Sequence, residues 1–389
     1  MPSGSRRRLA FIRRGLRPPF RVLIDARLPG DRSGGVQQWV LGLASGLSKL
    51  EGPDEYRFLV KEGEDGWLAP FLSGPCHLYI DRPPASGPAG GRPIAKRVNP
   101  VRRVRRAMGR WFPFLHRLRQ RPAGRPPESE QTPFDRIAAR AQADVVHFPR
   151  QTAALTHVPS IYQPWDLQHL HLPQFFSEEQ LRDRGQLYKA WADQAALVVV
   201  ATKWVQADVN EQLGIPMDRI AVVNPGPPTA IYALPSEADE AEAVERLGLP
   251  GRFLFYPAQP WGHKNHERLF DALRLLADRG LEAPLICSGY HNDGHQRVVD
   301  AAKQRGLESQ VRFLGFVSPT ELQVLYRRAT ALVFPSLYEG WGLPILEAFS
   351  AGLPVACSNV TSLPELVGDA AIVFDPLDTA DIAAAATVA

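Results

Sequence analysis

The chain has 389 residues, a length that predicts two domains of ordinary size, and 44% of its residues are hydrophobic, enough for two buried cores. A net charge of +4 excludes a general nucleic-acid-binding polycation, and no apolar run approaches the roughly 18 residues that span a membrane. The widely spaced Cys76, Cys287 and Cys357 predict neither a disulfide framework nor a zinc site, which favours a reducing cytosol.

The first residues are rich in arginine but contain no hydrophobic region of a secretory signal, so we expect a disordered basic lead-in over residues 1–19. Residues 20–25 (FRVLID) predict a short buried strand. A glycine loop ending at Gly34 and Gly35 follows, and then an amphipathic helix. A strand, a glycine loop and a helix in this order predict a doubly wound α/β domain, which we expect to cover residues 20–228.

A change in composition interrupts this first domain. Residues 81–133 are rich in proline, glycine and arginine, which predicts an insertion. Within residues 96–121, apolar residues recur at steps of three or four and arginines fill most other positions, which predicts a basic amphipathic helix kinked at Pro113. One interpretation docks this helix on an anionic membrane surface. The other packs it on its own domain with the arginines in solvent.

Candidate functional residues follow two later strands of the first domain. We expect strands at 56–60, 77–80, 144–148, 160–165 and 197–201, helices at 181–192 and after residue 202, and a stiff hinge at 224–228. His147 lies at the carboxyl end of its strand, where open α/β sheets bind ligands. Asp166 and His169 follow the next strand and are candidates to contact a sugar hydroxyl, although a lone histidine also suits a structural role.

The alternation of strands and helices restarts in a second domain, which we expect at residues 229–389. After an acidic helix at 237–247, a strand at 252–258 precedes Gln259 and Lys264, and Lys264 is predicted to open a helix. A lysine at this place is suited to neutralise a diphosphate. Ser288 and Gly289 end the next strand, and further strands are predicted at 311–315, 353–357 and 371–374.

Residues 331–334 are a short apolar run that predicts a strand, and the stretch FPSLYEGWGLPILEAFSAG, residues 334–352, continues from it through a tight glycine turn into a helix. Glu339 precedes the turn and Glu347 lies on the helix. The positive end of the helix dipole favours an anion above the turn, and a nucleotide diphosphate fits this place. We expect Glu339 to bind sugar hydroxyls and Glu347 to bind the ribose. The alternative is an ordinary turn of a parallel sheet with two solvated glutamates.

This stretch resembles the paired-glutamate signature of family 4 glycosyltransferases (glycosyl transferases group 1), and the resemblance covers roughly residues 20–380. It implies the GT-B fold, an α/β architecture of two Rossmann-like domains that face each other across a cleft. It also implies a retaining transferase without a metal or another cofactor. The implied donor-binding residues are Gly34, Gly35, Gln259, Lys264, Ser288, Gly289, Phe316, Val317, Glu339, Gly340, Trp341, Gly342, Leu343 and Glu347.

The implied catalytic residues are Glu339, Lys264, His147 and Asp166, and the implied acceptor side consists of Asp166 and His169. The sequence departs from the family pattern at three places. Gln259 replaces an arginine, Trp165 replaces a histidine, and Pro149 occupies the place of a second histidine. A second cation for the diphosphate would therefore come from His263 or His266, or be absent. We also expect the final crossover helices of the fold to be lacking.

The resemblance implies transfer of a hexose-type sugar from a nucleotide-sugar to a saccharide or lipid-linked saccharide, in envelope or exopolysaccharide synthesis. We expect a cytoplasmic protein, with peripheral attachment to the inner face of the membrane as one interpretation, and no nucleic-acid partner. Two alternatives stay open. A non-catalytic GT-B-like binding module is one, and a GT-B-fold sugar-nucleotide epimerase is the other, which the Glu339 and Glu347 pair fits poorly.

Overall fold

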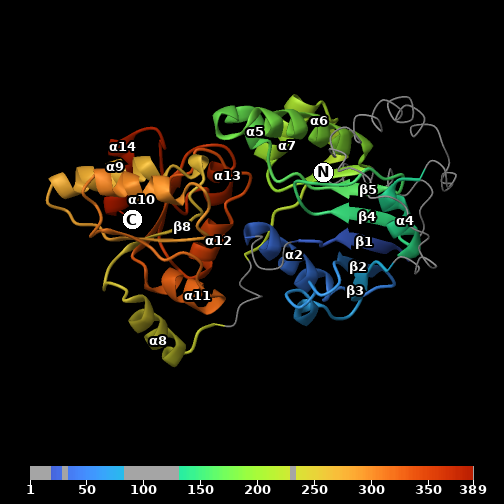
Figure 1. The fold of residues 1–389 in the computed structure, drawn as a ribbon, viewed down its shortest axis with the longest axis horizontal. Helices are drawn as coiled ribbons and strands as arrows, with labels where there is room; N and C mark the ends of the chain where they lie inside the picture. The colour runs from blue at the N-terminus through green and yellow to red at the C-terminus, as the bar shows by residue number, and fades with distance from the viewer. Residues whose placement is uncertain (1–18, 29–33, 83–130, 228–233, 389) are drawn as a thin grey trace, which may run out of the picture.

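The computed structural model describes residues 19–28, 34–82, 131–227 and 234–388 of the chain. Figure 1 shows two α/β units side by side, each a sheet with helices around it. The predicted basic lead-in, most of the 81–133 insertion and its arginine-rich helix lie outside the described residues.

In the described part of the chain, the first sheet has seven parallel strands in the order β3-β2-β1-β4-β5-β6-β7. The strands are β1 (Arg21–Asp25), β2 (Glu55–Val60), β3 (Cys76–Ile80), β4 (Val145–Phe148), β5 (Ser160–Tyr162), β6 (Leu197–Val200) and β7 (Ile220–Val222). The helices are α2 (Gly34–Leu47), α4 (Pro133–Arg140), α5 (Gln168–His171), α6 (Glu178–Gln194) and α7 (Lys203–Leu213). The strand order reverses between β1 and β4, where open α/β sheets place their ligand sites.

The second sheet has six parallel strands in the order β10-β9-β8-β11-β12-β13 within the described residues. The strands are β8 (Leu254–Pro257), β9 (Leu285–Ser288), β10 (Val311–Phe313), β11 (Ala331–Phe334), β12 (Val355–Ser358) and β13 (Ile372–Phe374). The helices are α8 (Glu237–Leu247), α9 (His266–Asp278), α10 (His295–Gln304), α11 (Pro319–Arg328), α12 (Leu343–Ser350), α13 (Leu363–Val367) and α14 (Thr379–Val388). Its order reverses between β8 and β11, so a second ligand site is expected beside Lys264 and Glu339.

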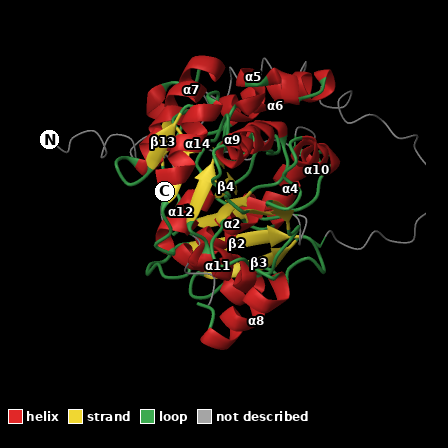
Figure 2. Cartoon of the chain, turned by 90° about the vertical axis from the view of Figure 1, so that its left-hand side faces the viewer, coloured by secondary structure: helices red, strands yellow, loops and turns green. Residues whose placement is uncertain are grey.

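Central strands of both sheets, such as β6 (LVVV) and β11 (ALVF), are continuous apolar runs, as expected for parallel sheets that are covered on both faces. The β11 strand is buried along its whole length, and Phe334 at its end is fully buried. Figure 2 shows the molecule from the side of the second unit, with helices surrounding the strands. Among the described residues, no helix has both the length and the apolar character to cross a bilayer.

Two local predictions need correction. The strand predicted at 160–165 ends at Tyr162, and residues 163–167 form a loop. Lys264 does not open a helix, because it ends the 3-10 turn Gly262–Lys264 and Asn265 adopts a left-handed conformation before α9.

Candidate functional site between the two domains

The two domains meet through the glycine turns predicted from the sequence. A Cβ atom placed at Gly340 would overlap the carbonyl oxygen of Trp165 and would lie 3.1 Å from the Cβ of Asp166. At the start of α2, a Cβ on Gly34 would lie 3.8 Å from the side-chain nitrogen of Gln259. Gly340 is therefore required for the close approach of the two domains, and the 339–343 turn lies directly against the Trp165–Asp166 loop.

Glu339 and Lys264 form an ion pair at the centre of the site. Lys264 Nζ lies 2.5 Å from Glu339 Oε1 and 5.4 Å from the centre of the Phe334 ring. The Glu339 backbone is fixed as well, since its N–H donates to Thr361 Oγ1 at 3.1 Å and its carbonyl accepts from Ser362 Oγ at 2.7 Å. Two residues that the sequence analysis named separately thus form an ion pair, and two hydrogen bonds hold the backbone of Glu339.

The start of α12 leaves backbone N–H groups without a side-chain cap. Gly342 is the N-cap residue at φ 111°, and no side chain caps the helix. The starts of α9 and α10 also lack a side-chain cap, whereas Ser or Thr caps α4, α6, α7, α8 and α11. Uncapped N–H groups and the helix dipole stabilise an anion, so this edge of the second sheet is suited to phosphate groups.

Glu347 is a buried acid, not a solvated one. Its side chain is on the inner part of α12, the residue is 7% exposed, and Oε2 accepts a hydrogen bond of 2.6 Å from the Tyr326 hydroxyl. Burial raises the pKa of Glu347 to about 7, although the Tyr326 hydrogen bond opposes the change. A carboxyl group with this pKa changes its charge near neutral pH, which the sequence alone did not indicate.

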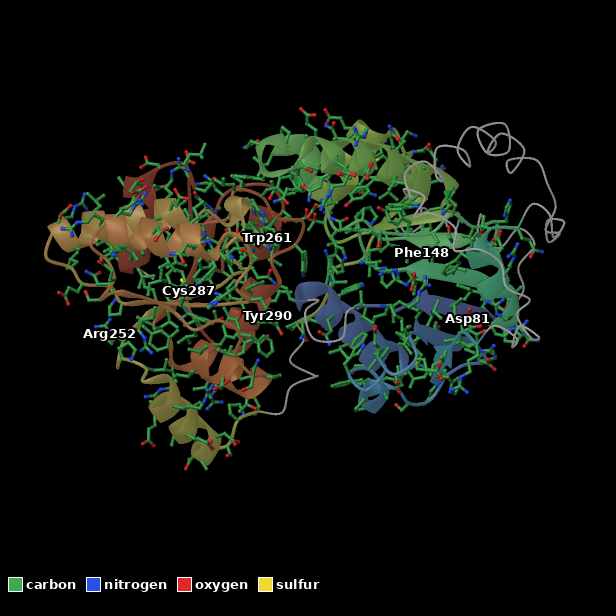
Figure 3. All side chains as sticks on the ribbon, viewed as in Figure 1. Asp81, Phe148, Arg252, Trp261, Cys287 and Tyr290 are labelled. Carbon is green, nitrogen blue, oxygen red and sulfur yellow. The ribbon has the colours of Figure 1, made fainter. Side chains whose placement is uncertain are left out.

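A small pocket lies beside this site at the carboxyl ends of β8, β9 and β10. Its lining comes from Ala258, Pro260, His266, Cys287, Ser288, Gly289, His291, His295, Phe313 and Gly315. Ser288 ends β9 and Gly289 follows it, as predicted, and their role in donor binding stays a prediction. Phe316 is 61% exposed and stacks on Tyr290, with ring centres 4.8 Å apart, while Val317 is buried. Figure 3 shows Tyr290 and Trp261 on the side of the second domain that faces the first.

The histidines near Lys264 do not supply the second cation. Burial lowers the pKa of His263 well below its ordinary value and lowers that of His266 to about 3, so both are neutral at neutral pH. Gln259, in the place of the expected arginine, accepts a hydrogen bond of 3.1 Å from the Trp261 indole. Within the described residues, Lys264 is thus the cation that contacts Glu339.

His147 is part of a hydrogen-bonded group that the sequence analysis missed. Its Nε2 lies 3.3 Å from Gln163 Oε1, which also accepts a 3.1 Å bond from the Trp39 indole. The Trp39 and Trp165 rings meet edge to face at 5.2 Å. Burial lowers the pKa of His147 to about 4, so the ring is neutral. The only feature of the sequence that could have indicated this hydrogen-bonded group is the position of Gln163 directly before Pro164 and Trp165.

The structure brings Asp166 to the site but leaves His169 in the interior. Asp166 accepts hydrogen bonds from Gln151 Nε2 at 3.0 Å and from the backbone N–H of Gln168 at 3.1 Å. Burial raises its pKa, and the charge of Glu339 adds to the effect. His169 is 1% exposed, packs against Tyr188 at 5.0 Å, and has a pKa lowered to about 4 by burial. Neither ring nitrogen of His169 has a partner among the described residues.

In the described ranges, no group of three or more His, Cys, Asp or Glu side chains is placed to hold a metal ion. The arrangement consists instead of one lysine, one carboxylate, and the uncapped start of α12, opposite Asp166 of the other domain. Chemically, it can hold an anion and place a carboxylate beside it.

Residues 239–387 match the family model for glycosyl transferases group 1. The second domain belongs to this family. The O-antigen chain mannosyltransferase B of Escherichia coli is 32% identical to the chain over 240 residues, which are 59% of the chain and 63% of that relative. The chain thus spans less than two thirds of the length of the curated relatives it matches.

Solved structures share the fold of both domains. The Anabaena protein Alr3699/HepE in complex with UDP-glucose has a TM-score of 0.64 and 18% identity, over 95% of the chain and 89% of that protein. The sucrose-phosphate synthase of Thermosynechococcus elongatus has a TM-score of 0.62 and 19% identity, over 95% and 88%. The GT-B fold predicted from the sequence is therefore confirmed.

Proposed function

We propose that this protein is a retaining glycosyltransferase that moves a hexose-type sugar from a nucleotide-sugar to a saccharide or lipid-linked saccharide. The observation that carries the proposal is the Lys264–Glu339 ion pair beside the uncapped start of α12, facing Asp166 across the domain interface. The names of the relatives support it, since they include an O-antigen mannosyltransferase and a protein solved with UDP-glucose. A role in envelope or exopolysaccharide synthesis follows from the same relatives.

The leaving group of such a transfer is a nucleoside diphosphate, whose negative charge grows as the glycosidic bond breaks. Lys264 and the backbone N–H groups at the start of α12 stabilise this charge, with Gly34 and Gly35 above it. The reaction then needs no metal ion. The transferred sugar keeps its anomeric configuration because the acceptor attacks from the face that the diphosphate leaves, and a diphosphate oxygen takes the acceptor proton.

The carboxylates have separate roles in this proposal. Glu339, held through its backbone by Thr361 and Ser362, binds hydroxyls of the donor sugar. Glu347 binds the ribose. Asp166 lies on the acceptor side, against the glycine turn that carries Glu339. The protein supplies position and electrostatic stabilisation, which together lower the barrier without a covalent intermediate.

The first test is a thermal-shift screen of the purified chain against UDP-, GDP-, ADP- and dTDP-sugars. A ligand that binds the native state raises the melting temperature, so one nucleotide class is expected to stand out. The selected donor is then incubated with saccharide acceptors, and proton NMR of the product gives the anomeric configuration. Retention supports the proposal. An inverted product, or no transfer and no hydrolysis with a donor that binds, contradicts it.

One further candidate has a specific observation behind it. Gln259 and Trp165 replace an arginine and a histidine of the family pattern, and Gln259 is engaged with the Trp261 indole. A binding module that has lost catalysis would show these changes. It would bind the nucleotide-sugar in the screen yet leave it intact, so the same two measurements separate the two functions.

A further inference from the structure

The residue before Glu339 crosses into the first domain. Tyr338 is 3% exposed, and its hydroxyl donates to Asp208 Oδ2 at 3.3 Å and accepts from the backbone N–H of Leu167 at 3.4 Å. Its ring lies 5.3 Å from the His171 ring and 5.5 Å from the Trp204 ring. An aromatic ring with a hydrogen-bonded hydroxyl tip is a typical anchor of a protein interface.

The receiving pocket belongs wholly to the first domain. Asp208 lies on α7 and is oriented by His171 on α5, whose Nε2 is 2.7 Å from Asp208 Oδ1. Leu167, which donates to the Tyr338 hydroxyl, directly follows the acceptor-side Asp166. The pocket therefore links the acceptor-side loop with α5 and α7, and Tyr338 connects all three to the loop that carries Glu339.

A second contact joins the same parts. The Glu365 carboxylate, on α13 of the second domain, accepts from the backbone N–H groups of Lys203 and Trp204 at 2.9 and 3.0 Å. These groups lie in the first turn of α7, where a carboxylate is favoured by the helix dipole. α13 begins directly after Ser362, which holds the Glu339 carbonyl. The Glu339 loop is thus bonded to α13, and both contact α7.

We propose that Tyr338 is a positioning residue for the transfer reaction, which by docking into the pocket of Asp208, His171 and Trp204 holds Glu339 against Asp166. This inference rests on the proposed function. Catalysis in a two-domain transferase requires that donor and acceptor groups come together in one geometry, and small displacements there lower turnover strongly. Tyr338 and Glu339 are adjacent, so the docked ring leaves little freedom to the carboxylate.

The protonation of the pocket agrees with this role. Burial raises the pKa of the Tyr338 hydroxyl far above its ordinary value, so it remains a hydrogen-bond donor throughout the physiological range. Burial also raises the pKa of Asp208, whereas the hydrogen bonds from His171 and Tyr338 lower it. Removal of the Tyr338 hydroxyl leaves Asp208 Oδ2 without the hydrogen bond that it accepts from Tyr338. This loss destabilises the form in which Tyr338 is docked against the first domain, and no other form.

The test compares Tyr338→Phe with Tyr79→Phe, a matched control on β3 of the first domain, in the full chain. Tyr338→Phe keeps the ring and removes one hydroxyl. We expect turnover with the donor found in the screen to fall about fivefold, the scale of one net hydrogen bond. The dissociation constant of the free nucleotide diphosphate should change little, because its proposed main contacts, Lys264 and the start of α12, lie in the second domain. Tyr79→Phe should leave both values as in the wild type.

A second measurement does not depend on activity. Spin labels at introduced cysteines replacing the exposed Glu179 and Glu308 report the distance between the domains. We expect a single short distance for the wild type and a broader, longer distribution for Tyr338→Ala and for Glu365→Ala. If the wild type is inactive with every donor but these distances shift, the proposed function fails while the docking remains. Three results would overturn the positioning role. They are distances that do not change in Tyr338→Ala and Glu365→Ala, turnover of Tyr338→Phe at the wild-type rate, and a loss of nucleotide affinity in Tyr338→Phe as large as its loss of turnover.

Discussion

The buried Glu347 gives a quantitative prediction about stability and pH. Its pKa rises from 4.5 to about 7 in the fold, so the native state holds this proton more tightly than the unfolded chain. The contribution of Glu347 to stability is therefore fully present below pH 4.5 and is lost as the pH rises through 7. Each pKa unit corresponds to about 1.4 kcal/mol, so the ionised carboxylate lowers the free energy of unfolding by about 3 kcal/mol.

Glu347→Gln removes this titration while keeping an oxygen for the Tyr326 hydroxyl. Relative to the wild type, the variant should gain roughly 2 to 3 kcal/mol of stability between pH 5 and pH 8, because most of the loss falls in this interval. Urea unfolding followed by circular dichroism at the two pH values measures the change. Glu282→Gln, at an exposed position of the same domain, is the control. A difference between variant and wild type that is the same at both pH values would refute the reasoning.

The other predictions concern the site and the arginine-rich segment. Lys264→Ala should lower turnover about 10²-fold and nucleotide affinity less, because the lysine acts mainly on charge that develops in the transition state. Equal losses of turnover and of nucleotide affinity would contradict this role. Gly340→Ala should lower turnover at least tenfold (~1.4 kcal/mol) with nucleotide binding retained, because the new methyl group overlaps the Trp165 carbonyl; calorimetry and initial rates test it. If residues 96–121 dock on membranes, the chain should sediment with anionic but not neutral vesicles and be released by high salt. Reversing the charges of Arg102, Arg103 and Arg106 should abolish that sedimentation.

Local sequence patterns predicted most of the architecture. The apolar run that became β11 and the acidic segment that became α8 lie within a few residues of their expected places, since each depends on its own periodicity. The Glu339 turn was predictable for the same reason, because glycine, proline and carboxylate positions within one short stretch define it. The start of α9 was missed by two residues, because the left-handed Asn265 ends the 3-10 turn there and no propensity rule indicated it.

Contacts between distant residues were not predictable. Tyr338 and Asp208 are 130 positions apart, and Glu365 and Lys203 are 162 apart, so each pairing depends on how the domains pack. Burial decided the charge states in the same way. From the sequence, His263 and His266 were candidate cations, whereas desolvation lowers their pKa values and makes both neutral. Glu347 was expected to be a solvated acid or a ribose contact, whereas desolvation raises its pKa to about 7, so that it is near half-protonation at neutral pH.

Glu339→Gln tests the central claim most directly. The change keeps the size and hydrogen-bonding capacity of the side chain and removes the charge that pairs with Lys264. With the donor selected in the screen and Glu282→Gln as control, turnover should fall about 10²-fold or more, the scale of one placed electrostatic contact. The affinity for the free nucleotide diphosphate should stay within about twofold of the wild type (~0.4 kcal/mol), because it carries no sugar for Glu339 to bind. Transfer by Glu339→Gln at the wild-type rate would contradict the assignment of the active site and favour the non-catalytic binding module.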